Sequence, residues 1–174
     1  MTQMIYWDHN ASTPLHPKVA TLLAESFQRA PTAPGNASSV HRGGREARRR
    51  LDDARARVAK ALRCEPKEVC FTGSGSEADA LALKGAFGAR KDRSRRKVVT
   101  STIEHPALLA TAAQLKAQGA ELVELRPTVT GQISEQALLE ALTPDVALCS
   151  LMWANNETGV LQPVPGAAKA CRER

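Results

Sequence analysis

The chain has 174 residues, and 24 lysines and arginines against 18 acidic residues give it a formal net charge of +6. This length suits one domain, or one domain with part of another. No apolar run of about 18 residues occurs, and no basic start followed by an apolar stretch opens the chain, so neither a membrane helix nor a signal peptide is predicted.

The first third of the chain predicts an arm and two helices. Residues 1–16 are irregular, 17–29 form a helix, 31–40 are a loop rich in Pro, Gly, Ser and Asn, and 41–63 form an arginine-rich helix. Much of the positive charge lies on this second helix, interleaved with acids, which indicates a solvated helix surface. Aromatic residues make up only 3%, so no nucleic-acid partner is expected.

From residue 64 onward, strands and helices alternate. Strands are predicted at 69–72, 97–101, 120–125 and 145–152, helices at 76–90, 105–119 and 134–143, and the opening of a further helix at 163–174. This rhythm predicts an α/β domain over 64–174, a three-layer sandwich with a mostly parallel sheet that is incomplete at its C-terminal end, preceded by the arm (1–16) and the N-terminal helices with their loop (17–63).

Four cysteines are widely spread, and no C-x-x-C pair suggests a zinc ribbon or a thioredoxin-like site. No metal site is expected. Cys70 and Cys149 lie in apolar runs and are predicted to be core thiols. Unpaired thiols and the missing leader sequence favour a cytoplasmic location.

The turn "TGSGSE" follows the first predicted strand of this domain. Ser74 and Glu77 have the spacing of a capping box, which would leave the backbone N–H groups of Gly75, Ser76 and Glu77 pointing outward at the positive end of a helix. This arrangement suits a phosphate, and the Ser76 hydroxyl adds a donor. A plain capped helix explains the turn equally well. The turn is neither G-x-G-x-x-G nor a Walker A loop.

Two more predicted strands end in polar residues. His105 follows the strand at 97–101, and Asn155, Asn156, Glu157 and Thr158 follow the most apolar strand. The carboxyl ends of parallel strands share one edge of a sheet, where ligands bind. We therefore expect the turn, His105 and the asparagines to converge on one site.

Five stretches, in this order and spacing, resemble the N-terminal half of the NifS/IscS-type cysteine desulfurases, pyridoxal-phosphate enzymes of the class V aminotransferase group with fold type I. They are "YWDHNASTPLHPKV", "GNASSVHRGGREAR", "CFTGSGSEADALALKGA", "TSTIEHPALL" and "ANNETGVLQPV". The resemblance implies that Gly75 and Ser76 bind the cofactor phosphate, that His105 stacks on the pyridine ring and assists proton transfer, and that Asn156 bonds near the ring hydroxyl. Asn155, Glu157 and Gly159 are expected to shape their loop.

The resemblance also implies cysteine as substrate, alanine and a persulfide sulfur as products, a homodimer, and a sulfur acceptor or iron–sulfur scaffold protein as partner. The family's Ser-x-His-Lys run, the aspartate facing the ring nitrogen and the mobile nucleophilic cysteine have no counterpart in the 174 residues. We therefore expect an N-terminal fragment that is inactive alone, binds the cofactor weakly or not at all, and needs a complementing C-terminal half.

Two alternatives stay open at this point. One is a non-catalytic α/β protein that binds phosphate or a partner. The other is a related enzyme of the same group, such as a selenocysteine lyase.

Overall fold

The structure is a computed structural model that describes residues 5–29, 32 and 35–173. Parts of three predicted segments lie outside the described residues, namely residues 1–4 of the arm, residues 31, 33 and 34 of the loop, and residue 174 of the last predicted helix. Contacts divide the chain into two compact units, Met1–Phe71 and Thr72–Arg174. Residues 64–71, which the sequence placed in the sheet domain, group with the helices before them.

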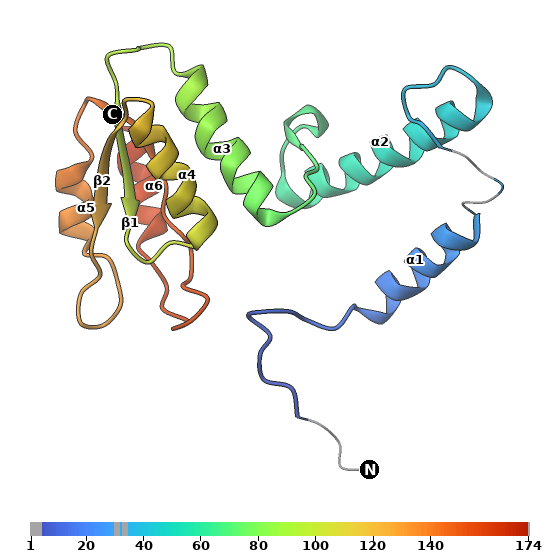
Figure 1. The fold of residues 1–174 in the computed structure, drawn as a ribbon, viewed down its shortest axis with the longest axis horizontal. Coiled ribbons are helices and arrows are strands. Elements are labelled where there is room, and N and C mark those ends of the chain that lie inside the picture. Colours follow the sequence, from blue (N-terminus) through green and yellow to red (C-terminus); the bar gives the residue numbers. More distant parts are fainter. Residues whose placement is uncertain (1–4, 30–31, 33–34, 174) are drawn as a thin grey trace. The chain divides into compact units, whose positions relative to one another are not determined.

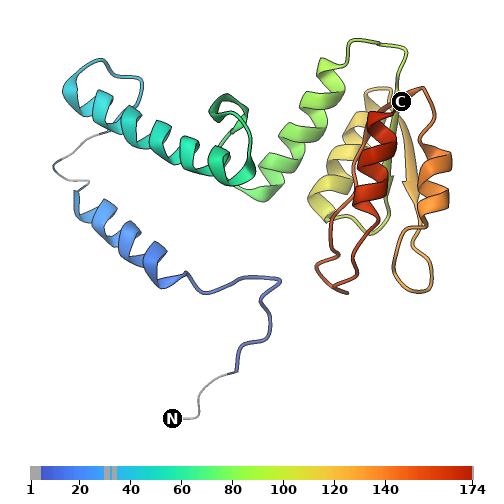
Figure 2. The ribbon, with the colours of Figure 1, turned by 180° about the vertical axis from the view of Figure 1, so that it is seen from behind.

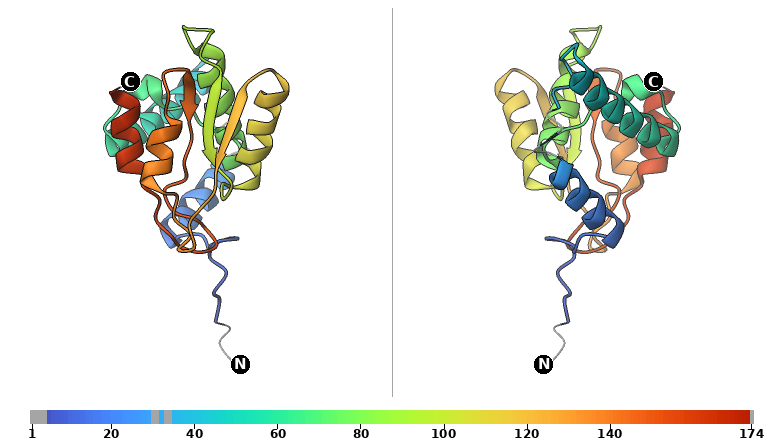
Figure 3. Two further views of the ribbon diagram at one scale, coloured as in Figure 1. Left: turned by 90° about the vertical axis from the view of Figure 1, so that its left-hand side faces the viewer. Right: turned by 90° about the vertical axis from the view of Figure 1, so that its right-hand side faces the viewer.

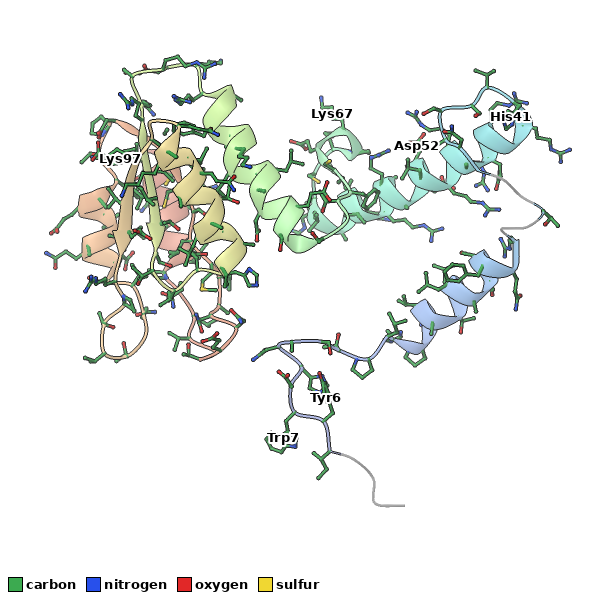
Figure 4. All side chains as sticks on the ribbon, viewed as in Figure 1. Tyr6, Trp7, His41, Asp52, Lys67 and Lys97 are labelled. Carbon is green, nitrogen blue, oxygen red and sulfur yellow. The ribbon has the colours of Figure 1, made fainter. Side chains whose placement is uncertain are left out.

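The first unit holds α1 (Pro17–Arg29), α2 (Arg42–Leu62) and the single 3-10 turn η1 (Pro66–Glu68). At the start of α2, the Nδ1 atom of His41 accepts a hydrogen bond from the Gly44 N–H at 3.2 Å. The arginine side chains pair with acids one turn away, as Arg49 does with Glu46 and Asp53. The basic run therefore forms an exposed, ion-paired helix surface, and Figure 4 shows His41 at the start of α2 and Asp52 farther along it.

The second unit is built around a parallel sheet with the order β2-β1-β3 among the described strands. Its elements are α3 (Gly75–Ala89), β1 (Lys97–Ser101), α4 (Pro106–Ala117), β2 (Glu121–Leu125), α5 (Glu135–Ala141), β3 (Val146–Cys149) and α6 (Val164–Arg172). Lys97–Ser101 of β1 pairs in register with Glu121–Leu125 of β2, and Val98 and Val99 pair with Leu148 and Cys149 of β3. Three of the four predicted strands are thus confirmed.

Helices cover both faces of this sheet. Leu83 and Phe87 of α3 pack with Leu108 and Leu115 of α4 against Val98, and they form one core. The next strand residue, Val99, faces the other way and packs with residues of α5 and α6. The views in Figures 1, 2 and 3 agree, with α3 and α4 on one face and α5 and α6 on the other. This arrangement confirms the predicted three-layer α/β sandwich.

The strand predicted at 69–72 is wrong, because no described strand pairs with it. Instead, Arg55 of α2 donates from Nε to the Val69 carbonyl at 3.3 Å, and its guanidinium carbon lies 5.7 Å from the centroid of the Phe71 ring. An apolar run becomes a strand only where a partner strand supplies its hydrogen bonds. Cys70 is exposed, so its prediction as a core thiol is wrong as well.

None of the described helices is both long and apolar enough to cross a membrane.

Candidate functional site

The turn before α3 is held by its own side chains. Ser74 is the N-cap of α3, and its Oγ accepts the Glu77 N–H at 3.2 Å. The Glu77 carboxylate accepts the Gly73 N–H at 2.7 Å. The predicted cap is confirmed, but the Glu77 N–H is occupied, so the expectation that it is free for an anion is wrong.

The N–H groups of Gly75 and Ser76 remain available in the first turn of α3, because these positions have no acceptor inside the helix. Both residues are exposed, and a Cβ atom built on Gly75 would meet no atom within 4 Å. The first turn of α3 therefore presents two backbone donors and the Ser76 hydroxyl on an exposed surface.

His105 is the N-cap of α4, where its Nδ1 atom accepts the Ala107 N–H at 3.2 Å. A helix cap is therefore one role that the structure assigns to this histidine. Because Nδ1 is the acceptor, the neutral ring carries its proton on Nε2. The side chain is exposed, so the cap leaves the ring accessible for a second role.

Glu104, one residue earlier, is only 6% exposed. Its Oε1 atom accepts two hydrogen bonds of 2.8 Å, one from the Ser101 hydroxyl at the end of β1 and one from the Met152 N–H after β3. Burial raises the pKa of the Glu104 carboxyl, and the negative charge of Asp79 raises it further.

Asn155 anchors the loop that follows β3. It is 8% exposed, and its Nδ2 donates to the Ile103 carbonyl at 3.1 Å. Its Oδ1 accepts the N–H groups of Glu157 at 3.0 Å and Thr158 at 2.9 Å, and Gly159 adopts a positive φ of 73°. The predicted loop-shaping role of Asn155 and Gly159 is confirmed, and it leaves the neighbouring Asn156 on the exposed surface.

A pocket of ≈ 270 Å³ lies where these segments meet at the carboxyl edge of the sheet, the lower edge in Figure 1. Asp79 of α3, Glu104 and His105 after β1, and Ser150 to Met152 after β3 all line it. The structure thus brings His105, the start of α3 and the segment after β3 to one edge. Gly75, Ser76 and Asn156 do not line the pocket, and their binding roles stay predictions.

Two further groups of the second unit, Cys149 and Lys97, do not line this pocket. Burial raises the pKa of the Cys149 thiol to about 12, with Cys171 contributing, so this core cysteine stays protonated at neutral pH. Lys97 lies at the amino end of β1, as Figure 4 shows, and donates to Thr143 at 2.7 Å and to Asp145 at 3.1 Å. Among the described residues, no group of histidines, cysteines and acids could hold a metal ion.

Sequence reasoning missed Glu104, Asp79 and Gln162. Gln162 is buried, and its Oε1 accepts the Ile133 N–H at 2.8 Å. Glu104 had a detectable signal, since it directly precedes a candidate histidine just beyond a buried strand. The other two show their roles only through partners distant in the sequence.

Comparisons with known proteins identify the family and the relatives of the chain. The sequence matches the family described as aminotransferase class-V over residues 5–174. It is 45% identical over 166 residues to the IscS-like cysteine desulfurase of Mycobacterium tuberculosis, covering 92% of this chain and 41% of that protein. It is 36% identical over 171 residues to the putative cysteine desulfurase IscS 1 of Bacillus subtilis, covering 98% of this chain and 44% of that protein.

Solved structures with the same fold include a NifS-like protein, with a TM-score of 0.88 and 31% identity over 98% of this chain and 46% of the other. SspA in complex with cysteine has a TM-score of 0.85 and 32% identity over 97% of this chain and 47% of the other. The chain spans less than half the length of each of these relatives. The family match, by contrast, covers almost all of the 174 residues, and we conclude that the chain belongs to the aminotransferase class-V family.

Proposed function

We propose that this chain provides the phosphate-binding turn and the ring-stacking histidine of a pyridoxal-phosphate-dependent cysteine desulfurase. The observation that carries the proposal is the meeting of α3, the His105 segment and the segment after β3 at one sheet edge. Relatives that match the chain over more than nine-tenths of its length are named cysteine desulfurases, which supports the same reaction.

Class V aminotransferases use pyridoxal phosphate, and the residues present fit this group. The first-turn N–H groups of Gly75 and Ser76, with the Ser76 hydroxyl, would bind the phosphate at the positive end of α3. Gly75 is exposed, and an atom at its Cβ position would meet no other atom within 4 Å. The exposed imidazole of His105 would offer a flat surface for the ring, and the exposed Asn156 would supply an amide to the ring hydroxyl.

When bound, the cofactor supplies an electron sink for negative charge at the Cα atom of an amino acid. The residues of this chain would orient the bound group and transfer protons. His105 is held by the bond that its Nδ1 atom accepts from the Ala107 N–H, and Nε2 is the ring nitrogen that the cap does not use. An imidazole can accept or release a proton near neutral pH, so Nε2 would serve as the proton-transfer atom.

The proposed reaction of the whole enzyme breaks the C–S bond of cysteine, releases alanine and leaves a persulfide sulfur for iron–sulfur cluster assembly or thio-modification. A lysine for covalent capture, a carboxylate for the ring nitrogen and a mobile thiolate would come from a complementing polypeptide segment. Cys149 does not supply the thiolate, because its pKa is raised to about 12.

Calorimetric titration with deoxypyridoxine 5′-phosphate tests the cofactor site. This analogue lacks the aldehyde and therefore does not react with surface lysines. The test variant is His105→Asn, in which asparagine keeps the cap but removes the ring. His16→Asn is the matched control, since His16 also precedes a proline and accepts the Lys18 N–H through Nδ1 at 3.2 Å.

We expect His105→Asn to weaken binding by about tenfold, the value of one aromatic stacking contact, and His16→Asn to leave binding unchanged. If both variants lose affinity equally, or if the wild-type chain does not bind the analogue even when combined with the complementing polypeptide, the proposed site is wrong.

A further inference from the structure

Glu104 joins two segments that are far apart in the sequence. Its partners Ser101 and Met152 lie three residues before it and 48 residues after it, and both bonds are 2.8 Å long. A second bond, from Asn155 Nδ2 to the Ile103 carbonyl at 3.1 Å, spans the same gap beside it. The His105 segment and the loop after β3 are therefore linked by two side chains at the carboxyl edge of the sheet.

The groups around Glu104 indicate that its carboxylate acts as a hydrogen-bond acceptor and not as an ion-pair partner. Charged or titratable groups face it from three elements: Asp79 of α3, His105 at the start of α4 and Cys149 of β3. Leu108 and Leu151 line the same pocket. No ion pair to Glu104 is present among the described residues, so its buried carboxylate is stabilised by the two hydrogen bonds.

Position 104 therefore requires a hydrogen-bond acceptor and does not require a negative charge. One oxygen atom accepts both bonds, and an amide oxygen can do the same. An alanine leaves the Met152 N–H without its acceptor in a half-buried position, which is costly. An aspartate is one methylene shorter and cannot reach both donors from the same backbone position.

We propose that Glu104 is a positioning residue that fixes His105 relative to the loop 150–156. The inference rests on the proposed function, in which His105 and Asn156 contact the same cofactor ring from these two segments. Glu104 does not touch that ring; it acts by holding the two segments at a constant separation through Oε1.

Amide hydrogen exchange followed by mass spectrometry tests the link directly on the 174-residue chain. In Glu104→Ala, we expect the peptide that contains Met152 to exchange about tenfold faster or more, because the N–H loses a charge-assisted bond. Glu104→Gln keeps the acceptor and should exchange like the wild type. The strand peptide 121–125 reports on global stability and should change little in either variant.

Glu68→Ala is the matched control. Glu68 Oε2 accepts the Glu65 N–H at 2.7 Å on an exposed turn of the first unit. This variant removes a bond of the same type and should leave exchange at Met152 unchanged.

Titration with the cofactor analogue tests whether the link made by Glu104 affects the cofactor site. Glu104→Ala should weaken deoxypyridoxine 5′-phosphate binding, and Glu104→Gln should restore it. Equal acceleration of exchange in 121–125 and 150–156, or failure of glutamine to rescue, overturns the positioning role. If the wild-type chain combined with the complementing polypeptide does not bind the analogue, the proposed function fails, and the exchange data still decide whether Glu104 links the segments.

Discussion

Glu104 gives the second unit a pH-dependent contribution to stability. Burial raises the pKa of this carboxyl above its ordinary 4.5, so the folded state binds the proton more tightly than the unfolded state. Its contribution is fully present below pH 4.5 and is lost as the pH rises through the folded pKa. Glutamine keeps both hydrogen bonds but has no charge. Glu104→Gln should therefore gain stability relative to wild type as the pH rises above 4.5.

Urea unfolding of both proteins over a pH series measures this difference. A difference between them that stays constant from acid to neutral pH would contradict the prediction.

Ser76 provides a second residue-level prediction, on phosphate binding. It lies exposed in the first turn of α3, so replacing it should remove one donor to the phosphate without changing the packing. We expect Ser76→Ala to weaken deoxypyridoxine 5′-phosphate binding by about three- to tenfold, with no effect on binding of deoxypyridoxine, which lacks the phosphate. Ser26→Ala, on the exposed surface of α1, is the control in the same calorimetric titration. A loss of affinity that is the same for both ligands would place Ser76 away from the phosphate.

Among single residues, the sequence identified those whose functional signal lies within a short stretch of the chain. The motif around His105 and the small-residue turn were found because a short stretch of chain contains the whole signal. Glu104 directly precedes His105, which is a signal, but a glutamate in a loop also resembles a solvated acid, so its burial was missed. Its burial depends on the Met152 N–H, which lies 48 residues away.

Among the elements, α2 depends on a glycine near its start. A Cβ atom on Gly44 would lie 2.1 Å from the Ser39 carbonyl oxygen, so any side chain pushes the preceding turn away from the helix. We expect Gly44→Ala to destabilise the first unit by about 1–3 kcal/mol. Gly85→Ala in α3 is the control, since its Cβ would meet no atom within 4 Å, and there alanine should be neutral or stabilising.

Circular dichroism during thermal unfolding measures both glycine variants. A stable Gly44→Ala protein would show that the turn at 36–41 does not pack against α2.

The elements themselves were predicted well where the pattern and the packing agree. The β-branched run at 97–101 became β1 with the predicted bounds, because helices cover both of its faces and partner strands lie on both of its edges. The run at 69–72 has equal apolar character but no partner. Apolar composition indicates burial, whereas pairing is decided by segments elsewhere in the chain.

For the whole molecule, the described structure leaves apolar surface and strand edges without partners. The α1 side chains Val19, Leu22 and Leu23 are exposed, and Phe27 is 74% exposed. β2 and β3 each pair on one side only among the described strands. Such features promote association, so we expect the purified chain to self-associate as its concentration rises. Sedimentation velocity over a concentration series measures this, and a monodisperse monomer throughout would contradict it.

The last prediction concerns catalysis by two polypeptides. The 174 residues contain no Ser-x-His-Lys run, so the chain alone should form no alanine from cysteine. It matches the Mycobacterium tuberculosis relative at 45% identity over 41% of that protein's length. The proposed function requires a second polypeptide that supplies a lysine, a ring-nitrogen carboxylate and a mobile cysteine, and the part of that relative outside the matched region is the polypeptide to test. Mixing the two should give cysteine-dependent alanine, detected by chromatography of the derivatised amino acid.

Two controls make this result specific. His105→Asn in the first polypeptide should reduce alanine formation, and His16→Asn should not, because both keep their helix caps and the proposal gives only His105 a contact with the cofactor ring. Alanine formation by the second polypeptide alone, or by the 174-residue chain alone, would show that the catalytic groups are divided differently from the proposal.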